Sequence, residues 1–147
     1  MNRRLLLKSG IALFSLLVIA PMRALAAAWN KPAFEAVQVE QALQEFGIKQ
    51  VEASDLITLI APDFAENGAI VQIEVESHIP GTEEISILAE KNPTSLIANF
   101  ILATGTEPHI ILRIKLGDSG PLKAVIKAGD KYYAAAKHVE VAIGGCG

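Results

Sequence analysis

The chain is 147 residues long and has a formal net charge of −3, with 16 acidic and 13 basic residues. Aromatic residues make up 5% of it, and an acidic chain that is poor in aromatic residues is a weak candidate for binding nucleic acid. The length suits one domain with a single hydrophobic core, and the one cysteine excludes disulfide bonds within the chain.

The N-terminus predicts an export signal. Arg3-Arg4 precedes an apolar run over 11–20, and the small residues Ala24 and Ala26 follow it. Twin arginines before a short apolar run are typical of the bacterial Tat export route. The run is too short to cross a bilayer, which takes about 20 residues. We therefore expect a Tat signal over 1–26, a periplasmic location, and no membrane segment after cleavage.

The segment after the signal is predicted to form one helix over 27–46. Asn30 is a suitable N-cap, and Pro32 fits the first turn because its missing N–H is not needed there. Gly47 is the expected C-cap. The apolar residues repeat with helical spacing and make one stripe, formed by Val39, Ala42, Leu43 and Phe46. We expect this stripe to pack on a sheet or on a partner.

From residue 54 onward the apolar residues repeat with a period of two, which is typical of half-buried strands. Predicted strands cover 56–60, 71–75, 85–89, 97–102, 110–116, 121–127, 131–136 and 139–143. About eight short strands separated by turn signals, with no helix between them, favour an antiparallel sandwich. We predict an all-β dominated, immunoglobulin-like β-sandwich with one N-terminal helix, as a single domain over 27–143.

The C-terminal tail carries the reactive group. It reads Gly144-Gly145-Cys146-Gly147 and holds the only cysteine. Because glycine has no side chain and few conformational restrictions, we expect a flexible arm over 144–147. In an oxidising compartment a single thiol implies an intermolecular bond or a working thiol. The tail offers no helix N-terminus or fixed cation to activate the thiol, so we expect activation inside a partner's active site. This indicates a carrier, not an enzyme.

Other catalytic or metal-binding chemistry has little support. His78, His109 and His138 lie on separate segments, and the sequence has no nucleophile elbow, phosphate loop or dinucleotide fingerprint. We expect surface histidines and no metal site. Asp63 and Glu66 are expected to form an acidic turn before a strand, not a pair of catalytic acids.

Charge is unevenly distributed along the chain. Residues 27–108 hold 3 basic and 13 acidic side chains, whereas 109–147 hold 6 and 3. Those six are Arg113, Lys115, Lys123, Lys127, Lys131 and Lys137. On one face near the tail they would attract an acidic partner; otherwise they protect strand edges from aggregation. We favour the second interpretation.

These features together resemble the SoxY family, the sulfur-carrier subunits of the bacterial thiosulfate-oxidising Sox system. The resemblance rests on the Tat signal, the sandwich pattern and the terminal Gly-Gly-Cys-Gly, with support from segments 61–69, 92–93 and 113–116. It implies that Cys146 covalently holds sulfur intermediates, such as a cysteine S-thiosulfonate, without another cofactor. Gly144, Gly145 and Gly147 would let the loaded arm enter partner active sites.

The resemblance also implies partners. SoxZ, a smaller sandwich protein, would form a heterodimer with this chain. This chain would be exported alone or together with SoxZ. The cytochrome SoxAX would couple thiosulfate to the thiol, the hydrolase SoxB would release sulfate, and the dehydrogenase SoxCD would oxidise the remaining sulfane sulfur. One departure is that the family typically ends Gly-Gly-Cys-Gly-Gly, whereas here one glycine follows Cys146. The closer carboxylate is expected to disfavour the thiolate slightly.

Three alternatives stay open. The first is a sulfane-sulfur carrier that serves sulfide or polysulfide. The second is a redox or metal-binding exported module, for example with copper held by His138 and Cys146. The third is an adhesion-type sandwich whose cysteine anchors it to another chain. The arm favours a carrier, because neither a sensor nor an anchor needs a stretch without side chains.

Overall fold

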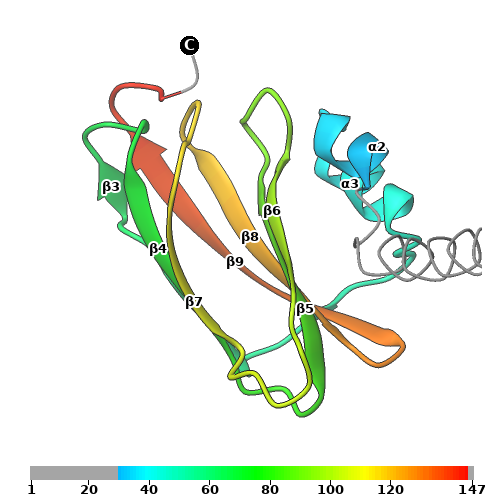
Figure 1. The fold of residues 1–147 in the computed structure, drawn as a ribbon. Helices are drawn as coiled ribbons and strands as arrows, with labels where there is room; N and C mark the ends of the chain where they lie inside the picture. The colour runs from blue at the N-terminus through cyan, green and yellow to red at the C-terminus, as the bar shows by residue number, and fades with distance from the viewer. Residues whose placement is uncertain (1–29, 146–147) are drawn as a thin grey trace, which may run out of the picture.

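Nine strands and two short helices make up the described part of the chain, residues 30–145 of a computed structural model (Figure 1). The signal predicted for 1–26 and the end of the arm, Cys146 and Gly147, lie outside the described residues. Among the described helices, none is long and apolar enough to cross a membrane.

The N-terminal helical region is broken in two. The helices are α2 (Lys31–Glu35) and α3 (Val39–Glu45), so the prediction of one helix over 27–46 is wrong. Ala36 has an extended backbone, with φ −67° and ψ 127°, and this ends α2. Its carbonyl then accepts hydrogen bonds from the Ser95 N–H at 2.9 Å and the Ser95 Oγ at 3.3 Å. A tertiary contact therefore overrides the helical spacing of the sequence.

The predicted caps of this region are confirmed. Asn30 Oδ1 accepts from the Ala33 N–H at 3.3 Å, and Pro32 lies in the first turn of α2. Gly47 follows α3 with φ +73°, a conformation that favours glycine, and its N–H donates to the Gln44 carbonyl at 2.8 Å.

The strands form two sheets. Their bounds are β1 (Glu52–Ala53), β2 (Ile57–Ile60), β3 (Phe64–Ala65), β4 (Val71–Ser77), β5 (Thr82–Ala89), β6 (Leu96–Ile101), β7 (His109–Ile114), β8 (Gly120–Ala128) and β9 (Lys131–Val141). The larger sheet has the order β1-β9-β8-β5-β6 with β3 also paired to β9, and the smaller has the order β2-β4-β7 (Figure 1). The predicted β-sandwich is confirmed.

Strand β9 differs from its prediction. The predicted segments 131–136 and 139–143 are joined in one strand that ends at Val141, because Lys137 and His138 stay in register opposite Leu122 and Pro121 of β8. Two further strands were not predicted, since β1 and β3 are only two residues each, too short to show a period. Both pair with β9 in parallel, within an otherwise antiparallel structure.

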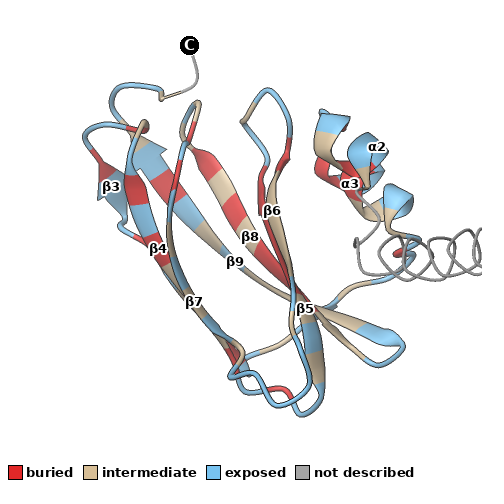
Figure 2. Cartoon of the chain, in the orientation of Figure 1, coloured by how far each residue is buried: buried red, intermediate tan, exposed pale blue. Residues whose placement is uncertain are grey.

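The larger sheet is covered on both faces, which explains the continuous apolar run at the end of β5. Between the sheets, Ile73 and Val75 of β4 meet Ile85, Ile87 and Ile126 in the main core. The helices cover the opposite face with a second cluster, formed by Ala33, Ala36, Val39, Ala42, Ile48, Leu88, Leu96 and Val125. Figure 2 shows the buried positions alternating along β4 and β8. The predicted helical stripe therefore packs on the protein's own sheet.

Candidate functional site

The last strand of the sandwich leads directly into the arm. β9 is held at its end by β3, with Ala65 opposite Val141. One residue later, the Ala142 N–H donates to the Ala65 carbonyl at 3.0 Å. The C-terminal segment therefore leaves the domain from a fixed point at one end of the sandwich (Figure 1).

Main-chain hydrogen bonds continue into the glycines of the arm. The Gly68 N–H donates to the Ile143 carbonyl at 2.8 Å, and the Gly145 N–H donates to the Leu116 carbonyl at 2.8 Å. The two receiving loops are joined to each other, because the Leu116 N–H donates to the Gly68 carbonyl at 2.8 Å. Gly144 is exposed and Gly145 is half-buried, and both lie against the domain up to the residue before Cys146.

The contact is so close that side chains do not fit. A Cβ on Gly145 would overlap the backbone of Gly68 and Ala69, and a Cβ on Gly144 would overlap the Gly117 carbonyl. The left-handed backbone conformation is found at other glycines, namely Gly47, Gly81, Gly105 and Gly129. Space, not backbone conformation, therefore explains why Gly144 and Gly145 are glycines in this structure.

Two polar side chains brace this end of the domain. Asn92 bridges the second loop: its Oδ1 accepts from the Gly117 N–H at 2.7 Å and its Nδ2 donates to the Lys115 carbonyl at 2.9 Å. Ser119 Oγ accepts from the Val141 N–H at 2.8 Å, which ties the same loop to the end of β9. These roles could not be predicted, because no periodic pattern in the sequence relates positions so far apart along the chain.

The predicted site residues fall into two groups. The structure describes Gly144 and Gly145, and it places them together against 68–69 and 116–117. Cys146 and Gly147 lie outside the described residues, so their roles stay predictions, as does the flexibility of the arm. Gly68 was missed as a site residue, although it lies in the segment 61–69 on which the family resemblance partly rested.

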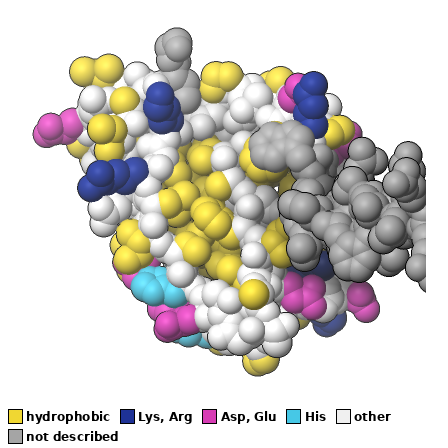
Figure 3. Space-filling model, viewed as in Figure 1, with side chains coloured by type: hydrophobic (Ala, Val, Ile, Leu, Met, Phe, Trp, Pro, Cys, Tyr) yellow, Lys and Arg dark blue, Asp and Glu magenta, His cyan; other side chains and the backbone are white. Residues whose placement is uncertain are grey.

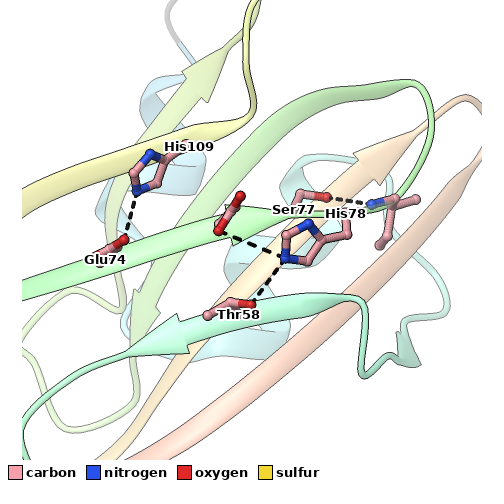
Figure 4. A network of polar contacts seen from close by, with 7 residues as sticks. Thr58, Glu74, Ser77, His78 and His109 are labelled. Atoms are coloured by element: carbon pink, nitrogen blue, oxygen red, sulfur yellow. Dashed lines mark hydrogen bonds and ion pairs between the residues drawn. The ribbon is translucent and has the colours of Figure 1, made fainter.

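The three histidines lie on the surface, as predicted. On the outer face of the smaller sheet, His109 Nε2 is 2.8 Å from Glu74 Oε1, and His78 Nε2 is 3.4 Å from Thr58 Oγ1 (Figure 4). On the larger sheet, His138 Nε2 is 2.9 Å from a carboxylate oxygen of its neighbour two residues on. Within residues 30–145, no group of three or more His, Cys, Asp or Glu side chains could hold a metal ion.

Asp63, one of the two acidic residues that precede β4, is paired with a lysine of β9. Asp63 Oδ1 lies 3.0 Å from Lys137 Nζ, and the same ammonium group donates to the Ala61 carbonyl. This ion pair links β9 to the segment around β3, which runs beside it. The acid therefore helps to hold the end of the strand that carries the arm.

The six basic residues of the C-terminal part do not all lie around the arm, although Lys115 directly precedes Leu116, which binds it. Lys137 pairs with Asp63, and Lys127 pairs with two glutamates of β5. Lys131 begins β9 and so lies roughly 30 Å along the strand from Val141, at about 3.3 Å per residue. On the face shown in Figure 3, the Lys and Arg side chains are separated from one another. Lys131 is therefore far from the arm, and Lys127 lies on β8, an inner strand of the larger sheet, so neither interpretation from the sequence holds for all six residues.

Lys127 stabilises the domain by an interaction that is lost at alkaline pH. Its Nζ lies 3.2 Å from Glu84 Oε1 and 3.2 Å from Glu83 Oε2, and hydrogen bonds to Glu84 and then Glu83 raise the pKa of Lys127. A raised pKa stabilises the fold below the unfolded-state value of about 10.4, and this contribution is lost as pH rises through the folded-state pKa. We expect Lys127→Met to be less stable than the parent at pH 8, with the difference shrinking above about pH 10.5 in urea unfolding. A difference that stays constant up to pH 12 would contradict this assignment.

One free edge of each sheet lies on the same apolar face. β6 ends the path of the larger sheet and β7 ends the smaller one. Half-buried apolar side chains line these strands and the residues next to them, namely Ile97, Phe100, Leu102, Ile110 and Leu112. Figure 3 shows hydrophobic side chains gathered over the middle of this face. Residues 95–106 contain no charged side chain, so β6 lacks the charges that usually protect an edge strand.

The fold and this end of the domain define a class: a β-sandwich protein whose last strand delivers a glycine-flanked terminal cysteine. The family model described as "Sulfur oxidation protein SoxY" matches residues 43–146, which include that cysteine. The chain belongs to the SoxY family.

Solved structures agree with this assignment. The sulfur carrier protein SoxY from Chlorobium limicola f thiosulfatophilum is 34% identical, with a TM-score of 0.64, and the match covers 71% of this chain and 94% of that one. A superoxide reductase (neelaredoxin) from Ignicoccus hospitalis is 17% identical, with a TM-score of 0.51, covering 62% of this chain and 94% of that one. The second likeness shows the fold alone. Among curated proteins, no sequence matches.

Proposed function

We propose that the protein is a periplasmic carrier that covalently holds sulfur intermediates of thiosulfate oxidation on Cys146 and presents them to partner enzymes. The observation that carries this proposal is the family match, which runs through the sandwich and includes Cys146. The solved relative with 34% identity is itself described as a sulfur carrier. The close packing of Gly144 and Gly145 against the domain gives the start of the arm a defined position, from which Cys146 would be presented.

The chemistry needs only a thiol from this chain. The Cys146 thiolate forms a sulfur–sulfur bond with the outer sulfur of thiosulfate, and a partner cytochrome of the SoxAX type takes up the two electrons released. Hydrolysis by a SoxB-type enzyme then adds water and releases sulfate and protons, which leaves a persulfide on Cys146. A SoxCD-type dehydrogenase takes up the electrons of that sulfane sulfur while water supplies its oxygen atoms and protons are released. A second hydrolysis then releases sulfate and returns the free thiol. The carrier supplies the attachment atom, and its partners supply the catalytic groups.

The compartment follows from the predicted signal. A Tat signal over 1–26 sends the domain to the periplasm, alone or with its partner. Removal of the signal takes away four basic residues and no acidic one, so the exported domain is more acidic than the whole chain, whose formal net charge is −3.

A heterodimer with a SoxZ-like subunit would use the apolar face at β6 and β7. The sequence left two candidates, the apolar helix and the strand edges. The helices are packed on the larger sheet, and among the strand edges we favour those of β6 and β7 because half-buried apolar side chains line both of them. An uncharged strand edge offers main-chain groups and apolar side chains to a second sandwich.

An intact-mass spectrum tests the function. The protein is recovered without reductant from cells that are oxidising thiosulfate, and adducts are mapped to the peptide that ends the chain. We expect thiosulfonate and sulfane additions on Cys146 that reductant removes. Sulfane additions alone, seen only with sulfide or polysulfide, would instead identify a carrier for those compounds. A bare thiol, or a stable mixed disulfide with one protein under all growth conditions, would refute the carrier.

A further inference from the structure

We propose that Gly68, Ala69, Leu116 and Gly117 form an arm dock, which binds the glycines of the arm and sets the resting position of Cys146. The proposal rests on the carrier function above, and it adds positioning residues to it. The dock is made of backbone from two loops that follow β3 and β7. These loops are joined by the 2.8 Å bond from the Leu116 N–H to the Gly68 carbonyl.

The arm is bound through two of its main-chain groups. The Ile143 carbonyl accepts from the Gly68 N–H at 2.8 Å, and the Gly145 N–H donates to the Leu116 carbonyl at 2.8 Å. Main-chain bonds of this kind fix a segment without using its side chains. The interaction therefore selects the arm by its lack of side chains, and a Cβ on Gly145 or Gly144 would collide with the dock.

The shape of the dock is maintained by groups that do not touch the arm glycines. Asn92 holds the second loop through Lys115 and Gly117, with bonds of 2.9 and 2.7 Å. Ser119 connects that loop to Val141 at 2.8 Å. Asn67 Oδ1 accepts from the Ala69 N–H at 2.9 Å and so fixes the turn of the first loop. Because the dock already has a fixed shape before the arm binds, binding of the arm costs little conformational entropy in the dock.

Docking changes how far the thiol can reach. With Gly145 bound, Cys146 is one residue beyond an anchored position, which is about 3.8 Å between successive Cα atoms. With the glycines released, the last anchored residue is Ala142, four residues before the cysteine, so the reach is roughly 14 Å. The dock thus provides a retracted position near the domain, and release provides the extended position that a partner's active site requires.

The test compares single alanine substitutions in the free protein, without partner or sulfur substrate. We expect Gly145→Ala to raise the exchange rate of the Gly68 amide proton about tenfold, because the loss of docking frees its acceptor at Ile143. The matched control is Gly147→Ala, which adds the same methyl group beyond the docked glycines and should leave that rate unchanged. Exchange at β8 amides, such as that of Ile126, should be equal in all variants and reports that the fold is intact.

A second measurement reports on the thiol. We expect Gly145→Ala to react severalfold faster with a bulky maleimide, relative to iodoacetamide, because release moves Cys146 away from the domain. Asn92→Ala should act in the same direction with an unaltered arm, and Asn92→Asp, which keeps the acceptor for the Gly117 N–H, should restore part of the parent behaviour.

Unchanged Gly68 exchange in Gly145→Ala, or an equal response in Gly147→Ala, would overturn the dock. Because neither measurement involves sulfur loading, the dock can fail while the carrier function stands. The carrier function can likewise fail in the mass spectrum while the dock stands.

Discussion

Cys146→Ser is expected to abolish sulfur loading completely and to leave the fold intact. A serine hydroxyl cannot form the sulfur–sulfur bond with thiosulfate, and the chain has no second cysteine to replace it. The substitution lies beyond the described hydrogen bonds of the domain, so the free energy of unfolding should change by less than about 0.5 kcal/mol. Mass spectrometry after incubation with thiosulfate and the partner enzymes measures the loading, and urea unfolding measures the stability.

The control for this substitution is Ser119→Ala, which removes a hydroxyl near the arm and keeps the thiol. It should still accept sulfur, with a modest loss of stability because the Val141 N–H loses its side-chain partner. Sulfur adducts on Cys146→Ser would show that another residue carries the sulfur. Unfolding of Cys146→Ser would show that the thiol has a structural role.

The second large effect is expected for the double variant Gly144→Val, Gly145→Val. Two branched side chains cannot lie against Gly117 and Gly68, and they widen the arm that has to enter a partner's active site. We expect the processing rate by partner enzymes to fall by about 100-fold, since small misplacements of a reacting group have effects of this size. Alkylation of Cys146 by iodoacetamide should be retained. A single-turnover assay with a preloaded carrier measures the processing.

The control is Ala142→Val, which puts the same branched side chain at an exposed position two residues before Gly144. It should be processed at nearly the parent rate. Processing of the double variant at the parent rate would show that the glycines matter neither for docking nor for entry into the partner. If Gly145→Ala undocks the arm but is processed normally, entry into the partner, not docking, accounts for the valine effect.

Local patterns in the sequence predicted much of the fold. The period of two over β4 and the turn residues between strands were enough to predict the sandwich, because each strand has one face in the core. They could not predict the helix break at Ala36, because that break depends on the hydrogen bonds that Ser95 donates to the Ala36 carbonyl in the folded protein. The two-residue strands β1 and β3 exist only because β9 lies beside them.

The candidate site could be predicted only where it is continuous in the sequence. Gly144, Gly145 and Cys146 stand together as a motif, so they were identified directly. The arm dock joins Gly68 to Leu116, and its brace Asn92 comes from a third loop; such contacts arise from the order of the strands. The same limit applies to the cations, since only the register of β5 and β8 shows that Lys127 faces Glu84.

The position of β9 also bears on how the protein is made. β9 is the last of the described strands, and besides its neighbour β8 it pairs with β1 and β3, which come from much earlier in the sequence. Pairings between such distant segments close late and slowly in folding. During synthesis the larger sheet lacks this strand until residues 131–141 emerge, and Cys146 follows them. The thiol thus joins the nascent chain only after the strand that completes the sheet.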